Sequence, residues 1–194
     1  MMDERTDGLG YSRKLIEELG LVPLSGESGY IGYISTSQIE VTQEIDGKPC
    51  RLKANGSIYY LLNKDRPMNY LHWLSPDDTH ILLQGGPVHY YEFRETENKP
   101  VSTHHLLGAN ILKGERPVLM IPGGSWKALI LPVDVEYALL STILTPQWSD
   151  SPDRLHIGAG EDFIKKYVNT SGWATEEFLL KLIGPNYGGF LPHN

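Results

Sequence analysis

The order of apolar and polar residues divides this chain into a central region of short strands and two helical ends. Near the start, Leu15, Ile16 and Leu19 recur at helical spacing, which predicts a short helix over residues 12–20. The serine at its first position can cap the helix, and the glycine at its last position can end it. After residue 146 the helical spacing returns, and helices are predicted over 161–168 and 175–183.

From residue 29 to about residue 144 the apolar runs are short and are separated by turn residues. Strands are predicted over residues 57–62, 79–84, 88–93, 118–121, 126–131 and 137–144. Gly85, Gly86 and Pro87 separate the second of these strands from the third, and this predicts a hairpin. Many short strands joined by glycine and proline turns are typical of a β-sandwich or β-barrel.

Composition narrows the classes of partner. The chain has 194 residues, enough for one domain with a substantial core, and 40% hydrophobic and 21% charged residues are ordinary for a soluble protein. A net charge of −7 and the lack of a basic run argue against a nucleic acid or an anionic membrane surface as partner. No apolar run approaches the ~20 residues that span a bilayer, and the charged first residues do not resemble a signal peptide. With Cys50 as its only cysteine the chain forms no internal disulfide, so a cytoplasmic location is expected.

One stretch keeps half of a metal-binding pattern. His72, Leu74, Asp78 and Gly85 have the spacing of the cupin signature G-x5-H-x-H-x3-E-x6-G, with leucine in place of the second histidine and aspartate in place of glutamate. The second signature, G-x5-P-x-G-x2-H-x3-N, is similar to residues 122–127, where Lys127 takes the place of its histidine. The resemblance therefore implies a cupin pocket in which two of the four metal ligands are lost.

The chain as a whole resembles the subgroup of the cupin superfamily known as domain of unknown function 985. The stretches that carry the resemblance are residues 27–30 (the family's EGGY segment), 56–62 (T-x-I-Y-F-L-L), 72–78 with 85–87 (H-R-L-x-S-D-E and G-D-P), and 107–126 (LG, GE-x-P and VPAGxW). This resemblance implies a mainly β fold, a single cupin jelly-roll barrel with a short N-terminal helix and C-terminal helices. One domain is expected over 1–194, with the barrel core at about 29–146 and a helical extension at about 150–194. Similarity to sugar-epimerase-type cupins implies a homodimer.

Departures from the family pattern bear on the substrate. Trp73 stands where the family has arginine after the motif histidine, and Gly32 and Thr36 stand where arginine is often found. His80 replaces a usual aromatic residue. A pocket that has lost cationic groups and gained a tryptophan is expected to prefer a less anionic substrate, aromatic or polyketide-like in character.

Three residues are the candidates for catalysis. His72 takes an inward-facing ligand position, and its ordinary pKa near neutrality suits a general acid or base. Asp78 could orient and charge-stabilise His72, or it could instead cap the turn formed by residues 75–78. Lys127 shares a strand face with Leu129, which places it inside the barrel as a base, a Schiff-base amine or an oxyanion donor. A slip in register would instead place it in solvent.

A bound metal is not expected, because Leu74 cannot ligate and a protonated Lys127 would repel a cation. No other cofactor is expected either. If a metal does bind, its ligands should be His72, Asp78 and His80, since His80 lies two residues beyond Asp78 on the same strand face. Aromatic and imidazole side chains near the motifs are predicted to contact the substrate: Tyr59, Tyr70, Trp73, His80, His89, Tyr91 and Trp126.

These observations predict a metal-independent small-molecule enzyme of the isomerase, epimerase or cyclase type, acting in a specialised biosynthetic pathway. In this interpretation His72 moves a proton near a carbonyl group, and Lys127 or a tyrosine stabilises the enolate-like charge. Two alternatives stay open from the sequence. One is a metal-dependent cupin oxygenase, and the other is a cupin that binds a small ligand without catalysis.

Overall fold

The computed structural model describes residues 8–45, 47–149 and 154–189. Along these residues the elements are helix α1 (Gly8–Glu18); strands β1 (Val22–Pro23), β2 (Tyr30–Thr36), β3 (Glu40–Ile45), β4 (Lys48–Lys53), β5 (Gly56–Asn63), β6 (Met68–Leu74), β7 (Asp77–Gly85), β8 (Val88–Thr96) and β9 (Lys99–Leu107); 3-10 helix η1 (Ile111–Lys113); strands β10 (Val118–Ile121), β11 (Ser125–Ile130), β12 (Tyr137–Thr145) and β13 (Leu155–Ile157); helices α2 (Glu161–Tyr167) and α3 (Glu176–Ile183); and 3-10 helix η3 (Gly184–Asn186).

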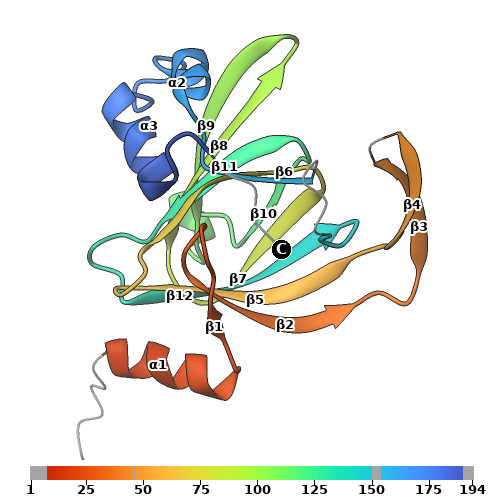
Figure 1. Cartoon of the computed structure of the whole chain (residues 1–194). Coiled ribbons are helices and arrows are strands. Elements are labelled where there is room, and N and C mark those ends of the chain that lie inside the picture. The colour runs from red at the N-terminus through yellow and green to blue at the C-terminus, as the bar shows by residue number, and fades with distance from the viewer. Residues whose placement is uncertain (1–7, 46, 150–153, 190–194) are drawn as a thin grey trace, which may run out of the picture.

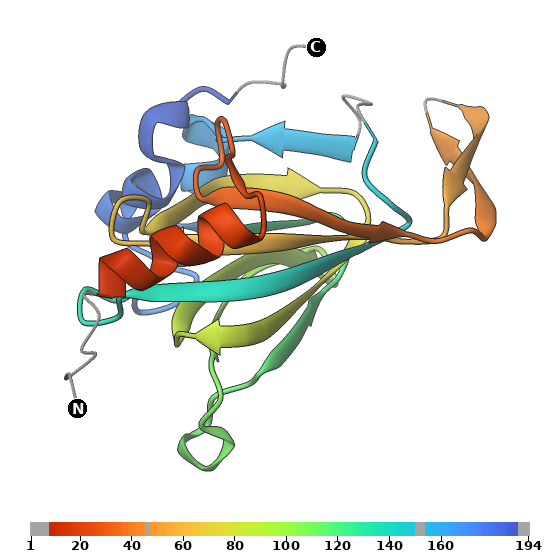
Figure 2. The ribbon, with the colours of Figure 1, turned by 90° about the horizontal axis from the view of Figure 1, so that it is seen from below.

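Two antiparallel sheets face each other and enclose the interior of a jelly-roll barrel. The first has the strand order β1-β2-β5-β12-β7-β10, and the second has the order β13-β6-β11-β8-β9. Helix α1 lies against the outer face of the first sheet, and α2 and α3 cover the outer face of the second (Figures 1 and 2). The β3–β4 hairpin projects from the body as a separate arm (Figure 1). The predicted mainly β fold is confirmed.

Every strand predicted from the apolar runs is present, but the hairpin predicted at Gly85-Gly86-Pro87 is wrong. Strand β7 pairs with β10 and β12, whereas β8 pairs with β9 and β11, so these three residues carry the chain from one sheet to the other. Both glycines have positive φ, and a Cβ on Gly85 would lie 2.3 Å from the Tyr137 carbonyl oxygen. The glycines therefore serve a crossing between sheets, which local sequence does not distinguish from a hairpin turn.

The helices form close to where the sequence predicts them. Helix α1 begins before residue 12, so Ser12 is not its cap; it is fully buried and accepts a hydrogen bond from Asn63 Nδ2 at 3.3 Å. At the other end, the backbone N–H of Phe178 donates to Thr175 Oγ1 at 3.2 Å and caps α3. In the described part of the chain, no helix is long and apolar enough to cross a membrane.

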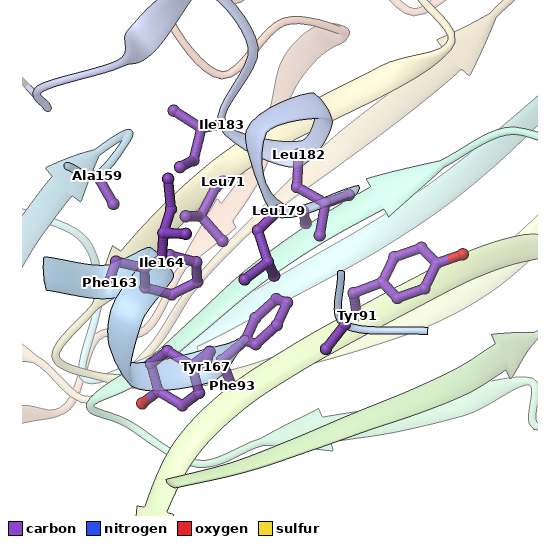
Figure 3. Packing of buried hydrophobic residues seen from close by; sticks show 12 residues of the cluster. Leu71, Tyr91, Phe93, Ala159, Phe163, Ile164, Tyr167, Leu179, Leu182 and Ile183 are labelled. Atoms are coloured by element: carbon purple, nitrogen blue, oxygen red, sulfur yellow. The ribbon is translucent and has the colours of Figure 1, made fainter. Parts of the chain in front are cut away.

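Strand alternation divides most of the buried apolar side chains between two large cores, and a smaller cluster of Leu21, Leu61 and Leu139 lies beneath α1. One core fills the barrel between the sheets, and it includes Tyr60, Leu62, Val88, Tyr90, Leu107, Leu129 and Leu140. The other lies between the second sheet and the C-terminal helices, as Figure 3 shows, and it includes Leu71, Tyr91, Phe93, Phe163, Ile164, Tyr167, Leu179 and Leu182. Neighbouring residues of one strand therefore serve different cores, and only the inward set can line a cavity within the barrel.

Candidate functional site

A cavity of about 590 Å³ opens between the two sheets, a volume suited to a small organic molecule. Its walls are largely apolar. Its polar groups are mostly buried, whereas Tyr33 and Trp148 at its mouth are 72% and 49% exposed. The residues that carry its chemistry are Glu27, Tyr60, Asn69, His72, Asp78 and His80.

His72 is placed by an irregularity in strand β6. The register of β6 against β11 shifts so that Tyr70 and Leu71 together oppose Ala128, which forms a β-bulge. The carbonyl oxygen of Tyr70 lies 3.0 Å from His72 Nδ1. Because a carbonyl can only accept, Nδ1 carries the hydrogen, and Nε2 is left as an acceptor in the cavity. Burial lowers the pKa of His72, so the imidazole is neutral at physiological pH.

Glu27 reaches the site from the loop before β2, and three contacts fix that loop. The Tyr70 N–H, turned by the bulge, donates to the Glu27 carbonyl at 2.7 Å. The Tyr60 hydroxyl donates to the Ser28 carbonyl at 2.8 Å, and a Cβ on Gly29 would lie 2.3 Å from that hydroxyl. The Glu27 side chain then accepts from Asn69 Nδ2 at 3.4 Å. As a result its Oε2 lies 3.7 Å from His72 Nε2.

Asp78 and Lys127 form a buried ion pair across the barrel. Lys127 Nζ lies 2.6 Å from Asp78 Oδ2, and the two side chains are 1% and 5% exposed. Burial alone would raise the pKa of the Asp78 carboxyl. The charges of His80 and Lys127 and the hydrogen bond from Lys127 outweigh burial, so the pKa lies below its usual value. The carboxylate therefore stays ionised, and the charge of Lys127 is committed to it.

His80 follows Asp78 on the inward face of β7, as the alternation predicts. Its Nδ1 lies 3.2 Å from the Tyr90 hydroxyl and 3.6 Å from Asp78 Oδ1. Burial lowers the pKa of His80 to about 4, a shift that Lys127 reinforces and Asp78 opposes. Two neutral imidazoles therefore face one cavity, His72 from the second sheet and His80 from the first.

These residues do not fit the metal that the cupin pattern implies. Of the four ligand positions, one holds Leu74 and another holds Lys127, whose amine contacts the only carboxylate of the set. In residues 8–45, 47–149 and 154–189, no group of three or more His, Cys, Asp or Glu side chains could hold a metal ion. The ligand set expected in the alternative case, His72, Asp78 and His80, lines the cavity but is not arranged as a metal site.

The structure brings together the three residues predicted as catalytic, but it gives them unequal access to the cavity. His72 and Asp78 line the cavity wall. Lys127 is inside the barrel, as its alternation with Leu129 predicts, yet it lies behind Asp78 and is almost completely buried. Its expected role as a direct oxyanion donor is therefore not supported. Asp78 is not the cap of the turn at residues 75–78, because Lys127 holds its Oδ2 and its Oδ1 accepts no hydrogen bond from any described residue. Its neighbour Asp77 accepts from the Gly123 N–H at 2.7 Å and so ties β7 to the turn between β10 and β11.

Of the residues predicted to contact substrate, only His80 lines the cavity; the rest point away from it. Tyr59 packs with Leu21 beneath α1, and Tyr70 lies over Gly184. Trp73 packs against His156 with ring centroids 5.0 Å apart and the rings tilted by 50°. These three placements correct the expectation that an aromatic wall, with Trp73 as part of it, surrounds the substrate.

His89, Tyr91 and Trp126 also lie outside the barrel. His89 stacks against Tyr91, and its Nδ1 lies 2.9 Å from His104 Nε2 on the neighbouring strand. Tyr91 and Trp126 belong to the core beneath the C-terminal helices. The physical reason is strand parity: in β8 the inward positions are those of Val88, Tyr90 and Glu92, so His89 and Tyr91 face outward.

Sequence reasoning missed Glu27, Asn69 and Tyr60. The signal for Tyr60 was available, because it alternates with Ile58 and Leu62 on the apolar side of β5. Glu27 was visible only as part of the family-like segment at 27–30. Asn69 carried no signal, since simple alternation from His72 places it outside, and only the bulge turns both side chains inward.

The two sheets form a jelly-roll barrel that contains a cavity of small-molecule size, and the described residues form no site for the metal that the cupin pattern implies. The protein is therefore of the cupin-barrel class. The model of the family described as cupin superfamily (DUF985) matches residues 13–153, and the chain belongs to this family. The predicted resemblance is confirmed.

The solved structures that are similar to this chain include one from Leishmania major and one from Shewanella oneidensis. A hypothetical protein from Leishmania major is 26% identical, with a TM-score of 0.65, over 74% of this chain and 85% of that chain. A protein from Shewanella oneidensis is 20% identical, with a TM-score of 0.70, over 90% of this chain and 98% of that chain, and this likeness shows the fold alone. No curated protein matches the chain.

Removal of Lys127 should destabilise the protein far more than removal of an exposed lysine. Lys127→Met leaves Asp78 buried without its partner, and we expect it to lower the free energy of unfolding by about 3–5 kcal/mol. Lys127→Met combined with Asp78→Asn should recover most of that loss. The control Lys165→Met breaks an exposed ion pair with Glu161 and should cost under about 1 kcal/mol. Urea unfolding measures all four proteins; equal costs for the two single lysine variants would contradict a structural ion pair.

Stability should fall between pH 7 and pH 4.5. In the unfolded chain His80 takes up a proton near pH 6.5, but in the folded protein it does so only near pH 4. The unfolded state therefore binds more protons in this window, and His80 alone accounts for a loss of about 2 kcal/mol in unfolding free energy. His80→Gln should show a shallower loss, and His156→Gln reports the effect of losing an imidazole outside the barrel. Equal slopes for wild type and His80→Gln would refute this assignment.

Proposed function

We propose that this protein is a metal-independent acid–base enzyme of the isomerase, epimerase or cyclase type that acts on a small molecule. The single observation that carries the proposal is the pair of neutral imidazoles, His72 and His80, on the wall of one cavity between the sheets. A neutral imidazole can accept a proton at one nitrogen while the other nitrogen donates. Two of them allow removal of a proton at one substrate position and hydrogen bonding at another.

His72 is the proposed base. Its Nδ1–H is held by the Tyr70 carbonyl, so Nε2 is the atom that accepts the proton. The imidazolium formed in this way faces Glu27, whose Oε2 is 3.7 Å from Nε2. A carboxylate at that distance favours the charged form of the histidine. Glu27 therefore stabilises the product of proton transfer, a role that the sequence-based proposal gave to Asp78.

His80 is the proposed hydrogen-bond donor to the substrate. If Tyr90 donates its hydroxyl proton to Nδ1, the hydrogen of the neutral ring resides on Nε2. Burial raises the pKa of the Tyr90 phenol well above its usual value, which keeps that hydroxyl protonated. A neutral imidazole can then stabilise negative charge on a substrate oxygen without a metal. In this proposal His80 takes the charge-stabilising role that the sequence suggested for Lys127.

Mutation of His72 tests the proposal. The protein is incubated in D₂O with a panel of cyclic α-hydroxyketones and hydroxyaryl ketones, and deuterium incorporation is followed by mass spectrometry. We expect catalysed exchange with at least one compound, and His72→Gln should slow it by ~10²-fold or more, since the base is lost. His156→Gln, an imidazole outside the barrel, should keep the wild-type rate.

Dialysis against a chelator should leave the exchange rate unchanged. Exchange that persists in folded His72→Gln would remove His72 from the mechanism, and loss of exchange after chelation would restore the metal-dependent alternative. Binding of panel compounds without any exchange would favour the non-catalytic binding protein.

We also propose that the chain forms a homodimer through the outer face of strands β7 and β10. Strand β10 is an edge of the first sheet, and Leu83, Val118 and Met120 on this face are 48%, 50% and 58% exposed. An exposed apolar edge strand is a pairing surface that soluble proteins usually cover. Similarity to dimeric cupins favours a second copy of the chain as its partner.

Light scattering should therefore give a mass near twice 21.8 kDa at micromolar concentration. Met120→Glu places a charge on the proposed interface and should shift the protein toward the monomer. Leu180 on helix α3 is 40% exposed, and the matched control Leu180→Glu should remain dimeric. A wild-type mass near 21.8 kDa would contradict the dimer.

A further inference from the structure

The cavity wall carries acidic but no basic side chains. Among the described residues that line it, the ionisable groups other than histidine and tyrosine are the carboxyls of Glu27 and Asp78, and no lysine or arginine is present. The nearby cation Lys127 is bound to Asp78. The nearby cation Arg154 is 3% exposed and donates to the oxygens of Ser75, Pro146, Gln147 and Ser149. Both cations are therefore already paired with groups of the protein.

One carboxylate oxygen of Asp78 has no hydrogen-bond donor among the described residues. Oδ2 is held by Lys127, but Oδ1 is buried and receives no hydrogen bond from any described residue. Its nearest ion-pair contact, His80 Nδ1, is 3.6 Å away, which is too long for a hydrogen bond. A buried carboxylate oxygen without a donor is costly, and this one belongs to a residue on the cavity wall. This oxygen has almost no accessible surface, so a ligand in the cavity does not reach it directly, and the acceptors that a ligand meets are those of Glu27 and His72.

The polar atoms around the two histidines are mainly acceptors. His72 Nε2 is an acceptor, because Nδ1 carries the hydrogen. Glu27 Oε2 lies 3.7 Å from it and is also an acceptor. The Tyr60 hydroxyl has already donated its proton to the Ser28 carbonyl, and the Asn69 amide donates to Glu27. The remaining polar side chains of the described wall are uncharged hydroxyls and amides, which do not neutralise an anion.

The remainder of the wall favours a hydrophobic skeleton. Its apolar residues include Ile31, Ile58, Leu144, Leu155 and Ile157. An apolar wall binds carbon frameworks through the hydrophobic effect, and the few polar groups fix the orientation of the ligand.

We propose that the ligand is a largely apolar molecule that carries hydroxyl or amine donors and is neutral or cationic, and that carboxylic acids and phosphates are excluded. The inference rests on the proposed function only in taking this cavity as the binding site. Glu27 receives the donors, and its carboxylate repels an anion because the described part of the wall has no cation to neutralise it. The charge of Asp78 is already balanced by Lys127.

Matched triplets of small molecules test the ligand class. Each triplet has a primary alcohol, a primary amine and a carboxylic acid on one skeleton, for example 2-naphthalenemethanol, 2-naphthylmethylamine and 2-naphthoic acid, with benzene and cyclohexane analogues. Affinities are measured by ligand-observed NMR titration at pH 7.5. The alcohol or the amine should bind ~10-fold or more tightly than the acid, as expected for one added charge-assisted hydrogen bond and one removed repulsion. An acid that binds as tightly as its partners, or the failure of every alcohol and amine, would overturn the inference.

Two variants link the preference to the cavity. Glu27→Gln removes one charge from the cavity wall and should reduce the difference in affinity between the amine and the acid. Glu44→Gln changes an exposed residue of the β3–β4 arm and should leave this difference unchanged. Thr142→Lys adds a cation to the wall and should improve binding of the acid. An unchanged difference in both cavity variants contradicts the assignment to this cavity.

Binding is measured at equilibrium, so its outcome is separate from that of the proton-transfer assay. A preference for donors without deuterium exchange supports the ligand class and refutes the proposed enzyme. If deuterium exchange depends on His72 but the protein binds acids more tightly, the result supports the proposed enzyme and refutes the proposed ligand class.

Discussion

The buried ion pair between Asp78 and Lys127 is the interaction on which the site depends. Asp78 lies on β7 of the first sheet and Lys127 on β11 of the second, so the 2.6 Å contact ties the two sheets together inside the barrel. In a metal-binding cupin, ligands at the corresponding positions converge on an ion. Here the cation is a side chain of the protein itself. A buried charge needs its partner, so neither residue can change alone without leaving the other unpaired.

This ion pair also sets the electrostatics of the cavity. The positive charge of Lys127 adds to the effect of burial and keeps the pKa values of His72 and His80 below their usual value. It also holds one oxygen of Asp78, and the other oxygen is buried without a hydrogen bond from the described residues. With leucine and lysine at two ligand positions of the cupin pattern, the barrel therefore holds two neutral imidazoles beside a buried ion pair. That combination suits proton transfer on a molecule that donates hydrogen bonds, and it differs from the Lewis-acid chemistry of a metal centre.

Membership of the cupin superfamily fixes the barrel and leaves the chemistry open, because a fold hosts many reactions through the residues placed on it. In this chain the barrel interior is divided into a packed core around Tyr90 and Leu140 and an open cavity toward the mouth. The C-terminal helices cover the outer face of the second sheet (Figures 1 and 3), and no residue of α2 or α3 lines the cavity. They bury Tyr91 and Trp126, two of the aromatic residues that the sequence had assigned to the substrate.

The sequence by itself determined six of the strands, the helices, the family and the inward direction of His72, Asp78, His80 and Lys127, because these depend on local periodicity and on motif spacing. Tertiary structure decided the rest. The crossing at Gly85–Pro87 depends on which sheet each strand joins. The inward turn of Asn69 depends on a bulge against β11. The approach of Glu27 to His72 depends on a hydrogen bond between residues 43 positions apart, and the contact of Lys127 with Asp78 joins two sheets. Pairings over such separations leave no periodic trace in a single sequence, so only the folded chain shows them.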